Sequence, residues 1–496
     1  FYDSKTILQE VVQGEHEQLS YILLEETGPL VMTSGNRGGE PIIIDEEEMM
    51  RHIGEAGIDF MLTHDREILT PLDDSIYQVN GDYVQLIRRA RGLVPEPIIL
   101  KRNLKKDTFA AGGDLKAVFA LGRENMVYLS QYFGDLEDVR CMESREQGIS
   151  RMQALFEIAP QVMVGDMHPA YVSYPTKTNE IQHHHAHVAS VIAEHGLEGK
   201  VLGIACDGTG FGTDGTIWGS EFLLCEKADM KRAGHFSTVK LVGGDASAKQ
   251  ANMTLYSYML QAKEQGLDVD AFFEEIREAC EGIAGKNTNL KQKVDTTLQK
   301  LTLQEMAWKQ NINTAYSSSM GRLFDAAASL LDICHYNSYE GECAILLEQM
   351  AHRGKMEYIQ SGASQKQAEE NFASSWLIQT IPLKMRTEKL GDTWQADSLQ
   401  LLVDLYQLKG KYTKEVLAYL FHYAVAQGIV ELAEHICEEN DVNQIALSGG
   451  SFINRILLHE VIVGLQEKGK MVYINEKVPC GDGGLALGQM YLASYS

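Results

Sequence analysis

The chain has 496 residues, of which 44% are hydrophobic and 23% are charged, a composition typical of a globular protein with about two to four domains. Its formal net charge of −25 argues against a broad nucleic-acid-binding surface, because phosphate contacts need clustered Lys and Arg. The 8 cysteines include no C-x-x-C pair, and no apolar run approaches the ~18 residues of a membrane span. We therefore expect a cytoplasmic protein without membrane or nucleic-acid partners. The chain begins FYDSKTILQE, without methionine, and we expect it to be a fragment of a longer protein.

Residues 1–98 alternate strand and helix patterns. A strand pattern, PLVMT, leads to a polar turn that includes Ser34 and Asn36, and a helix pattern, DEEEMMRHIGEAG, carries acids in its first turn. A short strand, DFMLT, follows, and a hairpin is predicted with Asn80-Gly81 at its turn. That hairpin ends in three arginines, Arg88, Arg89 and Arg91. Guanidiniums there could bind a phosphate or could simply face solvent, and the residues alone favour neither reading.

A charged segment, LKRNLKKD, follows Pro95-Glu96-Pro97, and residues 99–108 are predicted to be an exposed linker. Strand and helix patterns then alternate through residues 109–496, without an internal repeat. Residues 255–310 have few strand signals and predict a helical insertion. Further on, KYTKEVLAYLFHYAVAQGIVELAEHICEE predicts a long helical stretch made of two helices.

Four histidines occur among the five positions of the run HHHAH, at the start of a helix pattern. His183 and His187 are four residues apart and therefore share one helix face, which is the spacing by which one helix presents two imidazoles to a metal ion. A lone histidine is more often a packing or surface residue, but a run of four favours metal binding.

A buried-strand pattern, VLGIAC, ends at Asp207 and leads into Gly-Thr-Gly, where we expect a tight turn. The sequel FGTDGTIWGSEF predicts a hairpin with Asp-Gly at its turn. Further glycine turns occur at Gly243-Gly244 and Gly449-Gly450, and a late loop carries Asp482. Strand, tight turn and strand beginning Asp-Gly-Thr-Gly resemble the first phosphate loop of actin-like ATPases. The chain has no G-x-x-x-x-G-K-[ST] motif, so a P-loop ATPase is not expected.

Several motifs occur in one order along nearly the whole chain: TSGNRGGEP, IRRARGLVPEPI, GGDLK, DMHPAYVS, QHHHAH, DGTGFGTDGTIWGSEF, SSMGRLFDA, SYEGE, LSGGSFIN and DGGLALGQ. In this order they resemble the HypF carbamoyltransferases of nickel–iron hydrogenase maturation. The resemblance implies an α/β fold. Residues 1–98 would be the C-terminal half of a YrdC-like domain, and residues 109–496 a two-lobed actin-like domain that binds metal and nucleotide.

The family resemblance also implies a reaction. ATP would activate carbamoyl phosphate as carbamoyl-adenylate, and the carbamoyl group would pass to the C-terminal cysteine of the partner HypE for cyanide-ligand synthesis. The implied cofactors are ATP, Mg²⁺ and a divalent metal, and the ligand types do not decide between iron and zinc.

The resemblance assigns residues to three sites. The metal and the catalysis would involve His183, His187, Asp207 and Asp482. The nucleotide would be bordered by Gly208, Thr209, Gly210, Gly243, Gly244, Asp245, Gly321, Asp325, Gly449, Gly450 and Asn454. An adenylate site in the first domain would include Ser34, Asn36 and Arg88.

Two other functions remain open. A small-molecule O-carbamoyltransferase has the same two domains, but in the reverse order. A truncated paralogue could bind only nucleotide and HypE, although the intact metal-ligand pattern argues against it. The chain lacks the first half of the YrdC-like domain, so we expect it to retain carbamoyl transfer rather than adenylate synthesis.

Overall fold

A computed structural model describes residues 25–26, 28, 35–36, 39–56, 61, 63, 67–176, 178–284, 288–360, 381 and 383–496. The chain divides into two compact units, Phe1–Asp73 and Asp74–Ser496. In the first unit, the predicted acidic helix is confirmed as α3 (Glu46–Ala56), where the Asp45 carboxylate accepts a hydrogen bond from the Glu48 N–H and caps the helix. Ser34, the PLVMT strand and most of the DFMLT strand lie outside the described residues.

The second unit begins with the predicted hairpin. Strands β1 (Ile76–Asn80) and β2 (Tyr83–Arg88) pair antiparallel, and Gly81 adopts the left-handed backbone that the turn needs. The hairpin is attached to the rest of the unit because the Gln78 side chain donates to the Ile453 carbonyl at 2.8 Å.

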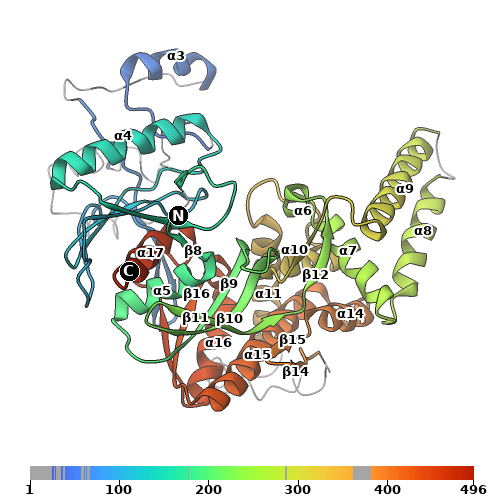
Figure 1. Ribbon diagram of the computed structural model, residues 1–496. Coiled ribbons are helices and arrows are strands. Elements are labelled where there is room, and N and C mark those ends of the chain that lie inside the picture. Colours follow the sequence, from blue (N-terminus) through green and yellow to red (C-terminus); the bar gives the residue numbers. More distant parts are fainter. Residues whose placement is uncertain are drawn as a thin grey trace. The chain divides into compact units, whose positions relative to one another are not determined.

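Two larger sheets follow, and each contains three consecutive strands that pair antiparallel. Figure 1 draws the strands as arrows. The first has the order β3-β6-β5-β4-β7-β8. Its strands are β3 (Ile98–Ile99), β4 (Thr108–Ala110), β5 (Ala120–Arg123), β6 (Met126–Leu129), β7 (Val162–Asp166) and β8 (Glu180–Ile181). The second has the main order β14-β15-β11-β10-β9-β16-β17. Its strands are β9 (Val201–Phe211), β10 (Ile217–Glu226), β11 (Asp229–Phe236), β12 (Val239–Val242), β13 (Thr314–Ser317), β14 (Thr387–Leu390), β15 (Thr393–Ala396), β16 (Gln444–Ser448) and β17 (Met471–Ile474).

The two sheets repeat one topology. In the first, β6-β5-β4 is antiparallel and β7 and β8 add in parallel; in the second, β11-β10-β9 is antiparallel and β16 and β17 add in parallel. The helices that connect the parallel strands or follow them are α4 (Val139–Phe156), α5 (His183–His195), α15 (Lys414–Asn440), α16 (Arg455–Glu467) and α17 (Leu485–Ala493). We found no sequence repeat that corresponds to this repeated topology. Two segments can form the same strand order with different residues, because the order requires only similar patterns of hydrophobic positions.

A helical segment interrupts the second half between β12 and β13, which pair with each other. It consists of α6 (Asp245–Lys249), α7 (Ala251–Glu264), α8 (Asp270–Ala284) and α9 (Thr288–Lys309), and it therefore begins about ten residues before the predicted start at 255. The remaining helices of this half are α10 (Met320–Leu330), α11 (Glu342–Gln360) and α14 (Ser398–Leu408). Helices α8 and α9 pack against each other (Figure 1).

The prediction of two helices in the stretch 411–439 was wrong, because Lys414–Asn440 form one continuous helix, α15. Gly428 does not break it: its missing Cβ makes room for the Met385 side chain, whose sulfur would lie 2.8 Å from an added methyl group. Among the described residues, α15 is the one helix long and apolar enough to cross a bilayer. Since 78% of its most apolar window is buried inside the structure, α15 has the character of a core helix.

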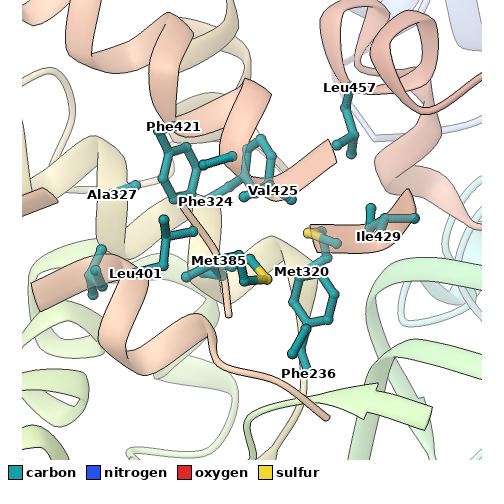
Figure 2. Packing of buried hydrophobic residues seen from close by; sticks show 14 of the residues in the cluster. Phe236, Met320, Phe324, Ala327, Met385, Leu401, Phe421, Val425, Ile429 and Leu457 are labelled. Atoms are coloured by element: carbon teal, nitrogen blue, oxygen red, sulfur yellow. The ribbon is translucent and has the colours of Figure 1, made fainter. Parts of the chain in front are cut away.

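The largest hydrophobic core lies between the second sheet and the helices of its half (Figure 2). Met320 and Phe324 of α10 meet Phe421 and Val425 of α15 there, and all four are buried. The exposed-linker prediction holds for the four basic residues of 99–108, whereas Leu100 and Leu104 are buried in a smaller core and Thr108 is buried at the start of β4.

Candidate metal centre

Helix α5 presents the histidine run to the interior. Gln182 caps its N-terminus by accepting a hydrogen bond from the His185 N–H, and Gly196 ends it in a left-handed conformation. The helix lies so close to β9 that a side chain at Gly203 would overlap Val188. Both predicted ligands, His183 and His187, are therefore buried, with exposures of 1% and 0%.

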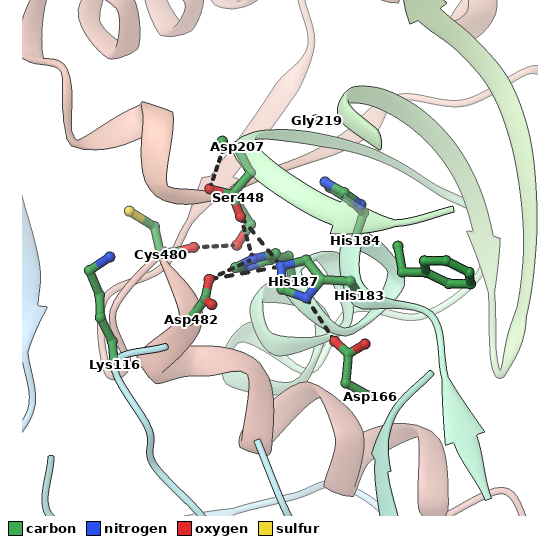
Figure 3. Close-up of polar contacts among 12 residues, drawn as sticks. Lys116, Asp166, His183, His184, His187, Asp207, Gly219, Ser448, Cys480 and Asp482 are labelled. Atoms are coloured by element: carbon green, nitrogen blue, oxygen red, sulfur yellow. Dashed lines mark hydrogen bonds and ion pairs between the residues drawn. The ribbon is translucent and has the colours of Figure 1, made fainter. Parts of the chain in front are cut away.

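Four predicted residues converge on one point (Figure 3). The Nε2 atoms of His183 and His187 lie 3.4 Å and 3.0 Å from Oδ2 of Asp207 in β9. They lie 3.8 Å and 3.7 Å from Oδ1 of Asp482, at the start of the short 3-10 helix η3 (Asp482–Gly484) before α17. All four candidate ligand atoms lie within 4.8 Å of one another. Two imidazoles and two carboxylates in this arrangement suit a divalent transition metal such as iron or zinc.

The electrostatics of the cluster also suit a cation. Burial alone would raise the pKa of Asp207, but hydrogen bonds from His183 and His187 hold it well below its usual value. Burial alone would lower the pKa of His183, but Asp166 and then Asp207 raise it well above its usual value. Each group is thus shifted toward its charged form, as expected where buried carboxylates require positive charge.

His184 and His185 are the other members of the histidine run, and neither belongs to the four-residue cluster. His184 lies beside Gly210 and Trp218, and burial lowers its pKa well below the usual value. Burial likewise lowers the pKa of His185 to about 4. Both are neutral packing residues, in line with the ordinary reading of a buried histidine.

Three charged or polar residues near the cluster were not predicted. Asp166 ends β7 and contacts His183; the sequence signal was available, since it ends a strand pattern just as Asp207 does. Tyr171 has its pKa raised by burial and by Asp482. Lys116 pairs with Glu340 at 2.5 Å; burial would lower its pKa, but Glu340 and then Asp482 raise it. The Lys116 ammonium group therefore lies near the carboxylates of Asp482 and Asp207 and is held in its charged form.

The tight turn predicted at Gly208–Gly210 was wrong, because β9 continues through Phe211 and the turn follows at 212–216. The long partner β10 keeps the segment extended, with a register shift opposite Asp207. Glycines fit closely around that carboxylate: a Cβ at Gly450 would lie 3.1 Å from Asp207 Oδ1, and one at Gly321 would lie 3.1 Å from the Cα of Gly208. The structure thus brings Gly208, Gly321 and Gly450 together.

The other predicted nucleotide residues have different surroundings. Gly449 has a positive φ and lies against the Cys206 carbonyl, where any side chain would overlap it. Gly243 and Gly244 form the turn into α6, which begins at Asp245, and their nearest neighbours include Met253 and Asn313 rather than the residues around Asp207. Thr209 lies within β9.

Asp325 and Asn454 are engaged within the protein. The Asp325 carboxylate pairs with Arg322 at 2.8 Å and accepts from Asn337 at 3.0 Å. Asn454 caps α16 through Leu457 N and donates its amide to Nε2 of His422 at 2.9 Å. These contacts orient both side chains, and their role toward a nucleotide stays a prediction.

The buried His422 predicts a pH-dependent stability. Burial lowers its pKa from 6.5 to about 4, so between these values the unfolded chain binds a proton that the folded one does not. Folding stability must therefore fall on acidification, by about 2 kcal/mol from this group at pH 5. The free energy of unfolding in urea should be measured at pH 8 and at pH 5. In His422→Gln, the decrease between the two pH values should be smaller than in the parent by that amount. His459→Gln, a partly exposed histidine of α16, is the control and should show the same decrease as the parent.

Of the predicted adenylate site, Ser34 lies outside the described residues. The Asn36 amide donates to the Glu40 carbonyl at 2.7 Å within the first unit. In the second unit, Arg88 donates to the Asp74 carbonyl and lies over the Tyr132 ring. The three residues as one site remain a prediction.

Two halves that share a five-strand order, with a histidine–aspartate centre built from both and glycines packed around it, define a protein of the actin-like fold class. Family comparison agrees: residues 203–489 match the model described as carbamoyltransferase, Kae1-like domain, second subdomain, and residues 103–194 match the HypF Kae1-like domain. Residues 16–90 match the YrdC-type model described as telomere recombination. The chain belongs to the HypF carbamoyltransferases.

Individual relatives agree with this assignment. Carbamoyltransferase HypF of Synechocystis is 30% identical, over 95% of this chain and 58% of its own length. Carbamoyltransferase HypF2 of Cupriavidus necator is 32% identical, over 97% of this chain and 58% of its own length. A shorter HypF homolog of the same organism is 30% identical, over 78% of this chain and 91% of its own length.

A solved structure of full-length HypF in its phosphate- and nucleotide-bound form superposes with a TM-score of 0.81 at 33% identity, covering 96% of this chain and 58% of that one. The HypF of T. kodakarensis gives 0.77 at 29% identity, covering the same shares. The chain thus spans 58% of the length of these full-length relatives.

Proposed function

We propose that this chain transfers a carbamoyl group from an activated donor to a cysteine thiolate in nickel–iron hydrogenase maturation. The observation that carries the proposal is the convergence of His183, His187, Asp207 and Asp482 within 4.8 Å in a member of the HypF family. The donor would be carbamoyl-adenylate, made from carbamoyl phosphate and ATP with Mg²⁺, and the acceptor the C-terminal cysteine of HypE. We propose that this takes place in the cytoplasm.

The four converging residues would hold a divalent iron or zinc ion. Such an ion, when bound, polarises a carbonyl as a Lewis acid and templates an attacking thiolate. The thiolate would attack the carbamoyl carbon, forming the C–S bond as the C–O bond to the adenylate phosphate breaks and AMP leaves with the electron pair.

The chain's own residues would favour this transfer in two ways. Lys116, beside Asp482 and Asp207, would offset the negative charge of the departing phosphate. The glycines around Asp207, namely Gly208, Gly321 and Gly450, would let a nucleotide approach the backbone closely.

The test separates transfer from activation. Purified chain is mixed with HypE, ATP, carbamoyl phosphate and a full-length relative that carries alanine at the residue equivalent to His187, so that the relative supplies carbamoyl-adenylate without transferring it. We expect the HypE terminal peptide to gain the mass of one carbamoyl group only when the chain is present. No gain would contradict the proposal and would favour a paralogue that only binds nucleotide and HypE. Carbamoylation of a small-molecule hydroxyl instead would favour an O-carbamoyltransferase.

A further inference from the structure

Asp166 is a buried carboxylate behind the metal-facing side of His183. It ends β7, is 0% exposed and lies on the first sheet, whereas Asp207 belongs to the second. Its Oδ2 lies 2.7 Å from Nδ1 of His183, and its Oδ1 accepts the backbone N–H of His168 at 2.8 Å. Figure 3 shows Asp166 on the opposite side of the imidazole from Asp207 and Asp482.

This contact determines which nitrogen of His183 can bind a metal. A carboxylate accepts hydrogen bonds and has none to donate, so Nδ1 must carry the hydrogen. In the neutral form that a metal ligand must adopt, the lone pair is then on Nε2, which faces Asp207 at 3.4 Å and Asp482 at 3.8 Å. The hydrogen bond from the His168 backbone holds the carboxylate itself in place, so the ring orientation is fixed from β7.

The two histidines are not equivalent in this respect. Nδ1 of His187 is buried and has no hydrogen-bond partner in the part of the chain that the structure describes. On the side of the ring that faces away from Asp207, nothing comparable therefore fixes the hydrogen of His187 or adds electron density to its ring. A carboxylate partner makes an imidazole a better metal ligand, so His183 should be the stronger of the two.

We propose that Asp166 is the positioning residue of the metal centre, which it serves by fixing the tautomer and orientation of His183. This inference rests on the proposed metal centre. Asparagine at this position retains the shape but removes the charge. Its amide can also turn to donate to Nδ1, which would move the hydrogen onto Nε2 and block the ligand atom.

The test measures metal affinity and ligand geometry rather than activity. Parent and Asp166→Asn are titrated with Zn²⁺ against a chromophoric chelator, and the Co²⁺ forms are compared by visible absorption. We expect Asp166→Asn to bind zinc about 10–100-fold more weakly at unchanged stoichiometry, with an altered Co²⁺ spectrum. A purely structural role would change the unfolding midpoint without changing the spectrum.

Glu194→Gln is a matched control. Glu194 is a partly buried carboxylate on α5, the helix that carries His183, but it accepts the N–H groups of Glu476, Lys477 and Val478 and is not one of the four cluster residues. Its substitution should leave zinc affinity and the Co²⁺ spectrum as in the parent.

The outcomes distinguish two kinds of failure. A parent that binds no zinc overturns the metal centre and this inference with it. A parent that binds zinc, with Asp166→Asn equal to it in affinity and spectrum, overturns the inference alone. If Asp166→Asn does not fold, Asp166→Glu keeps the charge but displaces it by one methylene; an unchanged Co²⁺ spectrum in that variant would also overturn the inference.

Discussion

Alanine at His187 or at Asp482 should lower metal affinity by more than about 100-fold, because each change removes a direct ligand, whereas outer partners account for about 10–100-fold. His187→Ala is the cleaner of the two possible histidine variants. Its Nδ1 has no partner among the described residues, whereas His183→Ala would leave the buried Asp166 without its imidazole. Metal content after purification and chelator competition give the two readouts.

The control for this experiment is His185→Gln. His185 is buried on the same helix but lies outside the four-residue cluster, and glutamine is of similar size. Its metal content should equal that of the parent. Full metal content in both His187→Ala and Asp482→Ala would contradict the assigned ligands, and His184 would then be the next residue to test.

Alanine at Gly488 should destabilise the protein and weaken the metal centre together. A Cβ on this α17 residue would overlap the carbonyl oxygen of Ala186 in α5. Backbone cannot move aside as a side chain can, so the two helices must separate, at a cost of about 1–3 kcal/mol. Ala186 lies between the two ligand histidines, and Asp482 closely precedes α17, so the same movement should pull the ligands apart.

Gly428→Ala provides the comparison. Gly428 is also a helix glycine, but the atoms in its way belong to the Met385 side chain, whose sulfur, Cβ and Cγ would lie 2.8, 2.9 and 3.0 Å from an added methyl group. Alanine gains about 1 kcal/mol of helix propensity there, which offsets part of the cost of moving Met385. Urea unfolding should therefore show a larger loss for Gly488→Ala than for Gly428→Ala. Equal losses, with unchanged metal affinity, would refute the close-packing argument.

Local patterns predicted much of the secondary structure. The acidic helix at 46–56, the hairpin around Gly81 and the histidine helix are all present, because each depends on spacing and caps within a few residues. The secondary-structure predictions failed where contacts between distant parts of the chain determine the backbone conformation. The stretch 411–439 was predicted as two helices, but packing in the core keeps α15 continuous. Gly208–Gly210 was predicted as a turn, but pairing with β10 keeps that segment extended.

The sequence by itself determined that His183 and His187 share one face of a helix, since that relation is periodic and local. With the family motifs, it also predicted that Asp207 and Asp482 would join them. Only the tertiary structure decided that Asp166 stands behind His183, and that Gly488 lets α17 bring Asp482 up to α5. Those relations arise from the pairing of segments far apart in the chain, and short-range spacing contains no information about such packing.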